Sequence, residues 1–513
     1  MKVAWITLVT ALLTGLLSVP AAALEIEGGS VEGSHENGTV IYRGIPYAAP
    51  PVGDLRWRPP APVVAWEGTR QTTEFAPACM QNGVSMPGEA PPSTGEDCLY
   101  LNIWRPDSAE TSLPVFVWIH GGGWTNGATS MPLYWGDRLA QRGIIVVTIA
   151  YRLGAFGFLA HPELTAESGG RTSGNYGLMD QIAALEWVKR NIASFGGDPS
   201  RVTIGGQSAG SMSVSILMAS PLAAGLFHGA IGQSGGFFEP VQLAPHYLLG
   251  NAERDGEAFA ASAGAHSIAE LRRLPAEAIL AADASRIAHP VLDGHVLAAT
   301  PFEVFAAGKQ AHVPLLIGSN AEEARAFTDP SGIDAGNFHE SIASAFGPLP
   351  PDLIAPYPVQ TTAQARESRI AFETDLRFGW NMSAWARLHA ETGESSVYLY
   401  RFERQPPFPA ASPYAGWGAA HFAELWYMFD HLGQADWQWQ DADHALAETM
   451  ANYWTSFIKT GNPNDSRTIQ WPAFAAKTQE LLILDGAVHT GVQDRPAAMA
   501  AFDAVYGALR GSP

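Results

Sequence analysis

Two serines in this chain stand in the pattern Gly-x-Ser-x-Gly, which can present a reactive hydroxyl group. The first is Ser208, in Gly206-Gln-Ser208-Ala-Gly210, and the second is Ser234, in Gly232-Gln-Ser234-Gly-Gly236. Where a strand runs into a helix through this pattern, the glycines permit a sharp turn and the serine projects above the sheet. Its position at a helix N-terminus favours developing negative charge, so the chemistry indicated is nucleophilic attack.

The residues behind the two serines differ, and they favour Ser208. A helix is predicted directly after Gly210, whereas Gly235, Gly236 and then Pro240 prevent a helix from starting directly behind Ser234. The pattern alone is weak, because it also arises by chance in a chain of this length. We therefore predict that Ser208 is the nucleophile and that Ser234 is a buried, hydrogen-bonding serine.

Three glycines in a row could stabilise the negative oxygen that such an attack creates. Gly121, Gly122 and Gly123 follow a predicted strand and the single residue His120. Glycines at a strand end leave backbone N–H groups exposed, with no side chain to block a substrate carbonyl. A plain glycine-rich turn or an anion-binding loop is the alternative. We expect His120 to be a structural hydrogen-bonding residue rather than a catalyst.

A serine nucleophile also needs a base, and an acidic residue that orients the base. Glu322 and Glu323 follow a predicted strand, and the residue types alone leave both open as the acid or as solvated surface charges. For the base, the chain offers 15 histidines. His421 lies in a loop of small residues, from which a side chain could reach Ser208.

These residues need a scaffold, and the chain alternates short apolar strands with amphipathic helices. Apolar residues recur at helical spacing within residues 177–195, which predicts a helix. The alternation indicates an α/β fold, with a central mostly parallel sheet and helices on both faces. The predicted strands of that sheet are residues 114–120, 144–150, 201–205, 230–233, 313–318 and 397–402.

Other segments are expected at the edges of this sheet. Residues 41–47 and 63–67 are predicted as smaller antiparallel strands. The Ala-rich stretches 241–290 and 331–395 are predicted as helical insertions packed on the sheet. No internal repeat and no Gly/Ser-rich or charged linker divides the chain, so we expect residues 24–513 to form a single domain.

Composition excludes several classes of partner. With 30 Lys and Arg against 50 Asp and Glu, the 513 residues carry a net charge of −20, which disfavours nucleic acids and anionic membranes. Asp441, Asp443 and His444 resemble metal ligands, but they open a predicted amphipathic helix, whose N-terminus suits acidic residues. We expect no metal, no nucleotide cofactor and a small-molecule substrate.

The first 23 residues have the parts of a secretory signal peptide. A basic start, an apolar run from Val3 to Val19 and Ala21-Ala22-Ala23 predict cleavage near Ala23 and a secreted or periplasmic protein. The alternative, a membrane anchor, would be short for a span. In an exported protein the two cysteines, Cys79 and Cys98, are predicted to form a disulfide, with two free thiols as the alternative.

Longer blocks of sequence resemble the type-B carboxylesterases, the α/β-hydrolase family that includes cholinesterases and bacterial para-nitrobenzyl esterases. The resemblance runs almost without a break from about residue 40 to 236 and recurs in shorter segments up to about residue 464. The most specific blocks are Tyr42-Arg-Gly-Ile-Pro-Tyr-Ala48, Glu96-Asp-Cys-Leu-Tyr-Leu-Asn102, Trp118-Ile-His-Gly-Gly-Gly-Trp124, Tyr151-Arg-Leu-Gly-Ala-Phe-Gly-Phe158, Gly174-Asn-Tyr-Gly-Leu-Met-Asp-Gln181 and Asn191-Ile-Ala-Ser-Phe-Gly-Gly-Asp-Pro199.

The resemblance implies a catalytic triad of Ser208 as nucleophile, His421 as general base and acid, and Glu323 as the acid that orients His421. Glu323 is preferred to Glu322 because the family's acid stands three residues after the position of Asn320. The order Ser, Glu, His along the chain is that of the α/β-hydrolases.

The same resemblance assigns supporting residues. The oxyanion hole would be the backbone N–H groups of Gly122, Gly123 and Ala209, and Cys79 with Cys98 would form the family's N-terminal disulfide. Ser234 matches a serine behind the triad acid, and Asp375 matches a carboxylate close by. No cofactor is implied.

The expected activity is hydrolysis of carboxylic esters through an acyl-enzyme. Gln207 stands where cholinesterases carry a Glu, and the loop between the cysteines contains no Trp, so choline esters are not expected as preferred substrates. A specialist for a bulky ester, of the feruloyl, pyrethroid or fumonisin type, is the alternative. A non-catalytic adhesion module is disfavoured by the intact triad. The aromatic residues near His421 that could line a gorge or pack in the core are Trp417, Phe422, Trp426 and Tyr427.

Overall fold

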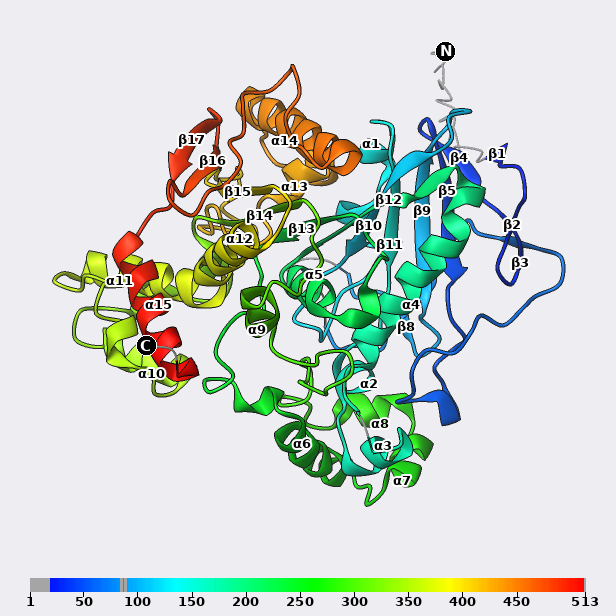
Figure 1. Cartoon of the computed structure of the whole chain (residues 1–513), viewed down its shortest axis with the longest axis horizontal. Coiled ribbons are helices and arrows are strands. Elements are labelled where there is room, and N and C mark those ends of the chain that lie inside the picture. The colour runs from blue at the N-terminus through cyan, green and yellow to red at the C-terminus, as the bar shows by residue number, and fades with distance from the viewer. Residues whose placement is uncertain (1–18, 84–85, 87–89, 171, 512–513) are drawn as a thin grey trace, which may run out of the picture.

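The computed structural model of the chain describes residues 19–83, 86, 90–170 and 172–511 (Figure 1). The predicted signal peptide lies outside the described residues except for its last five positions. Within the described part, no helix is both long and apolar enough to cross a membrane.

In the described part of the chain, a mixed sheet of twelve strands forms the centre of the molecule, in the order β1-β4-β5-β9-β11-β10-β12-β13-β14-β15-β16-β17. The strands toward its two edges are β1 (Val19–Pro20), β4 (Ser34–Glu36), β5 (Thr39–Pro46), β9 (Tyr100–Pro106) and β17 (His489–Val492). The strands from β11 to β16 in this order are parallel to their neighbours, and antiparallel pairs occupy both edges. The predicted α/β class is confirmed. The parallel strands are β11 (Ile145–Ile149), β10 (Leu113–Ile119), β12 (Gly197–Gln207), β13 (Gly229–Gln233), β14 (Leu315–Asn320), β15 (Val397–Phe402) and β16 (Glu480–Leu484).

Helices cover both faces of the sheet, and alternate residues of each strand serve one face or the other. In β10, Val115 and Val117 belong to the core that includes α4 (Tyr176–Asn191), α5 (Ala209–Ala219) and α12 (Trp380–Thr392). Their neighbours Phe116 and Trp118 pack in a second core with α1 (Asp137–Ala140), α13 (Leu425–Met428) and α14 (Asp441–Thr460). Every residue of β10 and β11 is buried, as expected of parallel strands covered on both sides.

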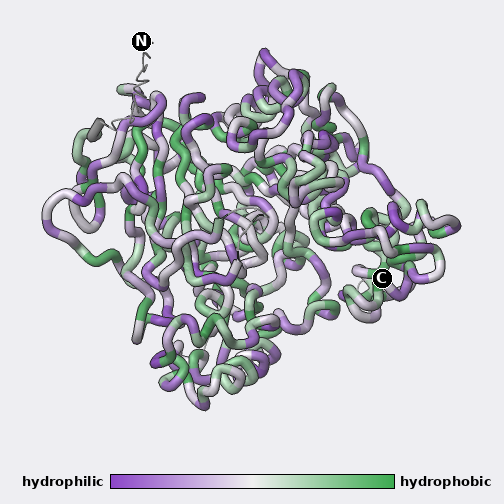
Figure 2. Tube along the Cα trace, turned by 180° about the vertical axis from the view of Figure 1, so that it is seen from behind, coloured by the Kyte–Doolittle hydropathy of each residue, from purple (hydrophilic) through white to green (hydrophobic). Residues whose placement is uncertain are grey.

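The predicted helical insertions are present at the periphery of the sheet (Figure 1). One contains α6 (Leu249–Ser262), α7 (Ile268–Arg273) and α8 (Ala276–Ala281). The other contains α10 (Phe338–Phe346), α11 (Thr362–Thr374) and α12. Figure 2 shows hydrophobic and hydrophilic residues alternating along the outer helices, which face solvent on one side. Helix α12 is the exception, because most of its residues are buried in the core.

The predicted strand at residues 63–67 is wrong. The strand in this region is β6 (Thr69–Gln71), which pairs in parallel with β3 (Gly29–Glu32) in a small separate sheet. Three prolines lie within residues 59–62, and proline cannot donate a ladder hydrogen bond. The segment is instead fastened by Trp66, whose backbone and ring N–H groups donate to the backbone of the Gly28–Ser30 turn.

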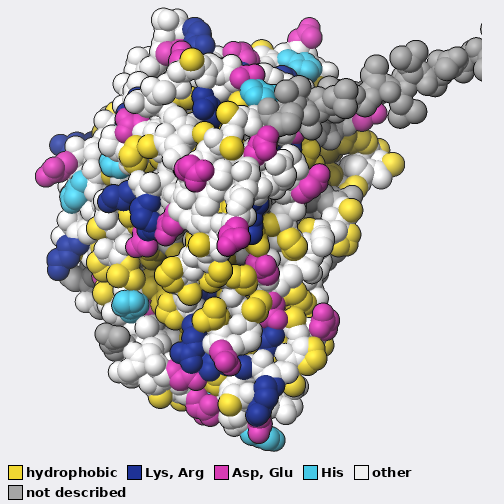
Figure 3. Space-filling view, turned by 90° about the vertical axis from the view of Figure 1, so that its right-hand side faces the viewer, with side chains coloured by type: hydrophobic (Ala, Val, Ile, Leu, Met, Phe, Trp, Pro, Cys, Tyr) yellow, Lys and Arg dark blue, Asp and Glu magenta, His cyan; other side chains and the backbone are white. Residues whose placement is uncertain are grey.

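Two further features of the outer shell bear on function. Cys79 and Cys98 form the predicted disulfide. On the face shown in Figure 3, acidic and basic side chains are interspersed with hydrophobic ones, so both signs of charge are represented there despite the net charge of −20.

Candidate active site

Ser208 occupies a sharp turn between β12 and α5. Its backbone angles, φ 58° and ψ −127°, lie in a region that non-glycine residues rarely adopt, and such strain gathers at functional sites. The Ser208 N–H group donates to the carbonyl of Gln233 on the adjacent strand, which holds the turn in place. The side chain is half-buried.

The two glycines around Ser208 are required by close approaches of the backbone. A Cβ at Gly206 would lie 2.4 Å from the carbonyl carbon of Gly210, and a Cβ at Gly210 would lie 2.0 Å from the Ile119 oxygen at the end of β10. Any side chain at either place would push β12, α5 and β10 apart. The Gly-x-Ser-x-Gly pattern is therefore explained by packing.

Ser234 shares the positive φ of Ser208 but not its surroundings. Its φ is 54°, and no helix follows directly, because the next α-helix, α6, begins at Leu249. The burial predicted for Ser234 is confirmed, but the predicted side-chain hydrogen bond is not: Oγ finds no partner among the described residues.

His421 and Glu323 form a buried pair. Nδ1 of His421 lies 2.6 Å from Oε2 of Glu323, and the second carboxylate oxygen accepts the Asn320 N–H at 2.7 Å. Because a carboxylate only accepts, Nδ1 carries the proton. Only 2% of the His421 surface and none of the Glu323 surface is exposed.

The neighbouring Glu322 points elsewhere. Its Oε1 accepts from Arg325 at 2.6 Å, and its Oε2 accepts the Ala419 N–H at 3.0 Å. The sequence left both glutamates open on residue types alone. Only Glu323 contacts the histidine.

The other ring nitrogen of His421 faces β12. Its Nε2 lies 3.1 Å from the side-chain amide nitrogen of Gln207, which is fully buried. Among the described residues, neither Ser208 Oγ nor the amide oxygen of Gln207 makes a hydrogen bond. Ser208 is the next residue in the chain, so the histidine reaches the turn that carries it.

Three phenylalanine rings surround the imidazole. Phe378 stacks on His421 at 4.6 Å between ring centres, Phe422 lies at 4.5 Å and Phe327 at 5.2 Å. Phe327 is 48% exposed, which leaves an apolar ring at the surface beside the histidine.

The aromatic residues predicted from the sequence near His421 divide between the site and the core. Of the four, Phe422 alone has a ring contact with the histidine. Trp426 and Tyr427 belong to the core around α14, and Trp417 packs against Tyr414. Phe327 and Phe378 were not predicted, because both are distant from His421 in the chain.

The glycine loop lies against the serine turn. A Cβ at Gly121 would be 3.0 Å from the Cβ of Ser208, and Gly122 has a φ of 100° that favours glycine. Ala209 is the first residue of α5, so its N–H has no partner within the helix. The three N–H groups predicted as an oxyanion hole therefore belong to two segments that meet at Ser208.

His120, at the start of this loop, is buried and its Nδ1 lies 2.9 Å from the Gly121 carbonyl. Burial lowers its pKa to about 4, so the ring is neutral at pH 7 and Nδ1 is the donor of that bond. The ring stacks on Tyr151 at 4.5 Å. This position agrees with the structural role predicted for His120.

Comparison with known proteins identifies the family. The model of the carboxylesterase family matches residues 20–344 and 353–500. The chain belongs to this family. It is a carboxylic ester hydrolase of the type-B class, which confirms the resemblance.

Its relatives support the same conclusion. It is 38% identical to the para-nitrobenzyl esterase of Bacillus subtilis (strain 168) over 480 residues, 90% of this chain and 94% of that protein. It is 37% identical to the fumonisin B1 esterase of Sphingopyxis macrogoltabida over 476 residues, 89% of this chain and 85% of that protein. A solved structure of a PNB esterase matches with a TM-score of 0.80 at 35% identity, covering 94% of this chain and 99% of that one.

A second buried carboxyl group, which the sequence analysis missed, lies behind the pair. Glu424 accepts hydrogen bonds from the side-chain amides of Asn320 at 2.6 Å and Gln233 at 3.1 Å. Burial, and then the nearby charge of Glu323, raise the pKa of Glu424 to about 7. The sequence signal for Glu424 was a charged residue directly before the apolar segment that forms α13.

Asp375 is buried near Glu323 but does not touch it. Both of its oxygens accept from Arg495 at 2.7 Å, and one also accepts from Tyr357 at 2.8 Å. The preceding residue, Thr374, accepts the N–H of Ala324 next to Glu323 at 3.2 Å. The segment that carries Asp375 therefore contacts the segment that carries Glu323 through the Thr374 hydroxyl and the Ala324 N–H.

Proposed function

We propose that this esterase cleaves its substrate through an acyl-enzyme on Ser208, with His421 as general base and acid and Glu323 as the residue that orients it. The observation that carries the proposal is the buried bond of 2.6 Å between His421 and Glu323, reached by the strained turn of Ser208. Ser208 directly follows β12 and Glu323 follows β14, while His421 contacts Glu323 and Gln207, the neighbour of Ser208. These positions support a serine, histidine and carboxylate that act together.

In the proposed mechanism, Ser208 Oγ attacks the ester carbonyl carbon while its proton passes to Nε2 of His421. Glu323 accepts a hydrogen bond from Nδ1–H of the imidazolium and stabilises its positive charge. When the tetrahedral intermediate collapses, the bond to the alcohol oxygen breaks and the alcohol leaves with the Nε2 proton. Water then attacks the acyl-enzyme with the same base, and the carboxylic acid is released.

The oxyanion of each tetrahedral intermediate would be bound by the N–H groups of Gly122, Gly123 and Ala209. Backbone donors fixed in a site that excludes water stabilise developing charge without reorganisation. The Ala209 donor also stands at the positive end of α5. In this proposal Asp375 and its partner Arg495 hold the backbone beside Glu323, and Ser234 fills the core behind it.

For the substrate, the three phenylalanine rings around His421 favour an ester with an apolar alcohol portion. A specialist of the kind represented by the fumonisin B1 esterase is the second candidate, supported by 37% identity over most of both chains. The adhesion-module alternative is disfavoured by the presence of Ser208, Glu323 and His421 in one arrangement.

We also propose export, with removal of residues 1–23 and a single mature domain of residues 24–513. The disulfide Cys79–Cys98 supports this, since disulfides persist in oxidising compartments. N-terminal sequencing of the exported protein would test it, with a start at Leu24 expected. An intact leader would contradict the proposal.

The experiment for the triad is a series of initial rates on p-nitrophenyl esters of increasing acyl length. Ser208→Ala should lose at least about 10³-fold in kcat with its fold intact. Ser234→Ala is the matched control, because that serine stands in the same five-residue pattern, and it should retain activity. Near-normal turnover in Ser208→Ala would contradict the assignment.

A further inference from the structure

We propose that Gln207 is a positioning residue that holds His421 in its neutral, Nδ1-protonated form in the resting enzyme and gives up Nε2 when an ester binds. This inference rests on the proposed function of His421 as the base. Gln207 touches neither the ester nor Ser208 Oγ in this account, and it acts through the histidine.

The neutral imidazole of His421 carries one proton, and its position decides which nitrogen can accept. Nδ1 donates to Glu323, so the neutral ring has one lone pair left, on Nε2. The side-chain amide nitrogen of Gln207 lies 3.1 Å from Nε2 and can only donate. A ring that accepts at Nε2 is a neutral base, which is the form that proton transfer from Ser208 requires.

The single lone pair on Nε2 can accept from only one donor at a time, the Gln207 amide or the Ser208 hydroxyl. Gln207 and Ser208 are consecutive residues, so the turn that brings one donor to Nε2 also carries the other. In this structure the bond goes to Gln207, and Ser208 Oγ makes none with the described residues. The serine proton can pass to Nε2 only after the amide has withdrawn, so an ester bound at the serine must displace Gln207.

The side-chain oxygen of Gln207 could also be turned toward His421. The oxygen of Gln207 is buried and has no partner among the described residues, so rotating the amide by half a turn breaks no bond at that oxygen. After rotation the oxygen can accept from an Nε2 that carries a proton. A glutamine can thus serve both forms of the histidine, whereas an ionised glutamate could only accept and would favour the charged form.

Several charged or titratable groups lie on the elements packed around His421. Of the charged or titratable groups in the described part of the chain, only Glu323 bonds the ring directly, and it faces Nδ1 rather than Nε2. The others are Glu424 on the segment behind it, Tyr400 on β15, Glu322 with Arg325 in the turn that carries Glu323, Arg377 beside Phe327, and His120 before the glycine loop. Gln207 is therefore the residue whose exchange alters the Nε2 side alone.

The test is the pH dependence of kcat/KM for p-nitrophenyl acetate in the parent enzyme, Gln207→Glu and Gln207→Met. With an added carboxylate at Nε2, the pair takes up a proton at higher pH, and the acid limb should move up by about one pH unit in Gln207→Glu. Gln207→Met keeps roughly the size of the side chain but has neither the amide donor nor a carboxylate, so its limb should move up clearly less than that of Gln207→Glu.

Two results would overturn the inference. Superimposable acid limbs in the parent and Gln207→Glu would show that the residue does not act on the histidine. An acid limb in Gln207→Met that coincides with that of the parent would show that the amide hydrogen bond does not hold the ring in its neutral form.

Labelling by diethyl p-nitrophenyl phosphate in the same preparations separates this inference from the proposed triad. If the parent is labelled at Ser208 and the limbs coincide, the role of Gln207 alone is wrong. If Ser208 is not labelled, the proposed function itself fails.

Discussion

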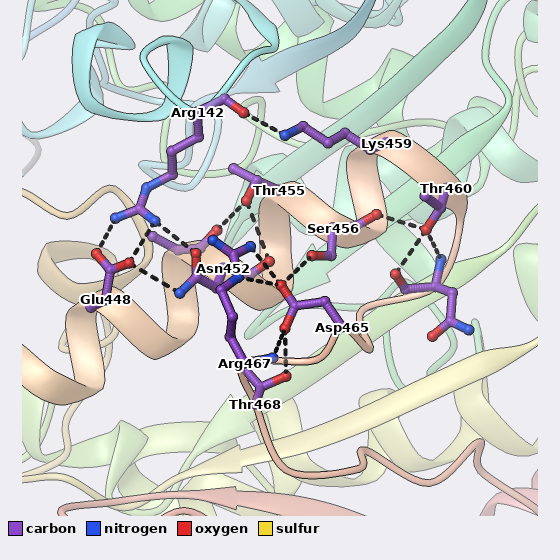
Figure 4. Close-up of polar contacts among 12 residues, drawn as sticks. Arg142, Glu448, Asn452, Thr455, Ser456, Lys459, Thr460, Asp465, Arg467 and Thr468 are labelled. Carbon is purple, nitrogen blue, oxygen red and sulfur yellow. Dashed lines mark hydrogen bonds and ion pairs between the residues drawn. The ribbon is translucent and has the colours of Figure 1, made fainter.

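Two polar clusters of this protein, one around His421 and one around Arg142, differ in burial and in how completely their polar groups are hydrogen-bonded. The Arg142 cluster ties the segment before β11 to α14 at the surface, and its charges are well partnered (Figure 4). Arg142 donates to Glu448, Asp430 and Asn452 at 2.5–3.2 Å. Nearby, Lys459 at the end of α14 donates to the Arg142 carbonyl, where a cation also suits the helix dipole.

The cluster around His421 is buried and incompletely partnered. Glu323 and Glu424 lie close enough to raise the pKa of Glu424, and the amide oxygens of Gln207 and Asn320 have no partner among the described residues. Such groups cost stability in a dry interior. The partnered charges of the surface cluster need no explanation beyond folding. The unpartnered polar groups of the buried cluster are explained by the chemistry proposed for them.

The largest expected effect on kcat is at Glu323, in the buried cluster. Glu323→Gln should lower kcat by about 10³- to 10⁴-fold, because the amide no longer holds the histidine in its working form. Glu322→Gln, one residue away and facing Arg325, is the matched control and should change kcat far less. Comparable losses in the two variants would show that the acid has been assigned to the wrong neighbour.

The next effect concerns the pH dependence of stability at Glu424. Its pKa in the folded protein, about 7, exceeds the ordinary value of 4.5, so the folded state binds this proton more tightly than the unfolded state. As the pH rises from 4.5 to 7, the free energy of unfolding of the parent should therefore fall by an amount on the order of 3 kcal/mol.

Glu424→Gln cannot ionise and should escape that loss. Thermal unfolding of both proteins from pH 4.5 to 7.5 checks this, and the difference in Tm should shift in favour of the variant as pH rises. Loss of one accepted hydrogen bond adds only a constant offset. A difference that does not change with pH would contradict the buried acid described here.

The smallest effect belongs to the surface cluster. Glu448 is 58% exposed at its side chain, and its bonds to Arg142 and Asn452 lie at the protein surface. Glu448→Gln should lower the free energy of unfolding by less than about 1 kcal/mol and leave kcat/KM unchanged. Urea unfolding and esterase rates check both statements. A loss comparable to that at a buried charge would break the contrast.

Much of the scaffold could be predicted because local pattern decides it. The strand β15 matches its predicted bounds, and the helix α4 with its final turn nearly does. The strand predicted at residues 63–67 is wrong because Trp66 there bonds the backbone of Gly28 and Ser30 instead of pairing in a ladder, a contact that periodicity does not register.

The site was predictable in its types of residue but not in its contacts. Gly-x-Ser-x-Gly and the glycine loop are local patterns, and close backbone approaches at Gly206 and Gly210 explain the first. The bond from Gln207 to His421 joins residues 214 positions apart, and Glu424 meets Gln233 across 191 positions. Only the order of strands in the folded sheet brings such groups together.

The most direct test of the central claim is to trap the acyl-enzyme and locate it. The enzyme is mixed with p-nitrophenyl acetate, quenched in acid within the first turnover and digested, and the acetylated peptide is sequenced by mass spectrometry. The proposed mechanism predicts one acetyl group, on Ser208, and none in Ser208→Ala. Acetylation of Ser234 instead, or full turnover with no acylated serine, would contradict it.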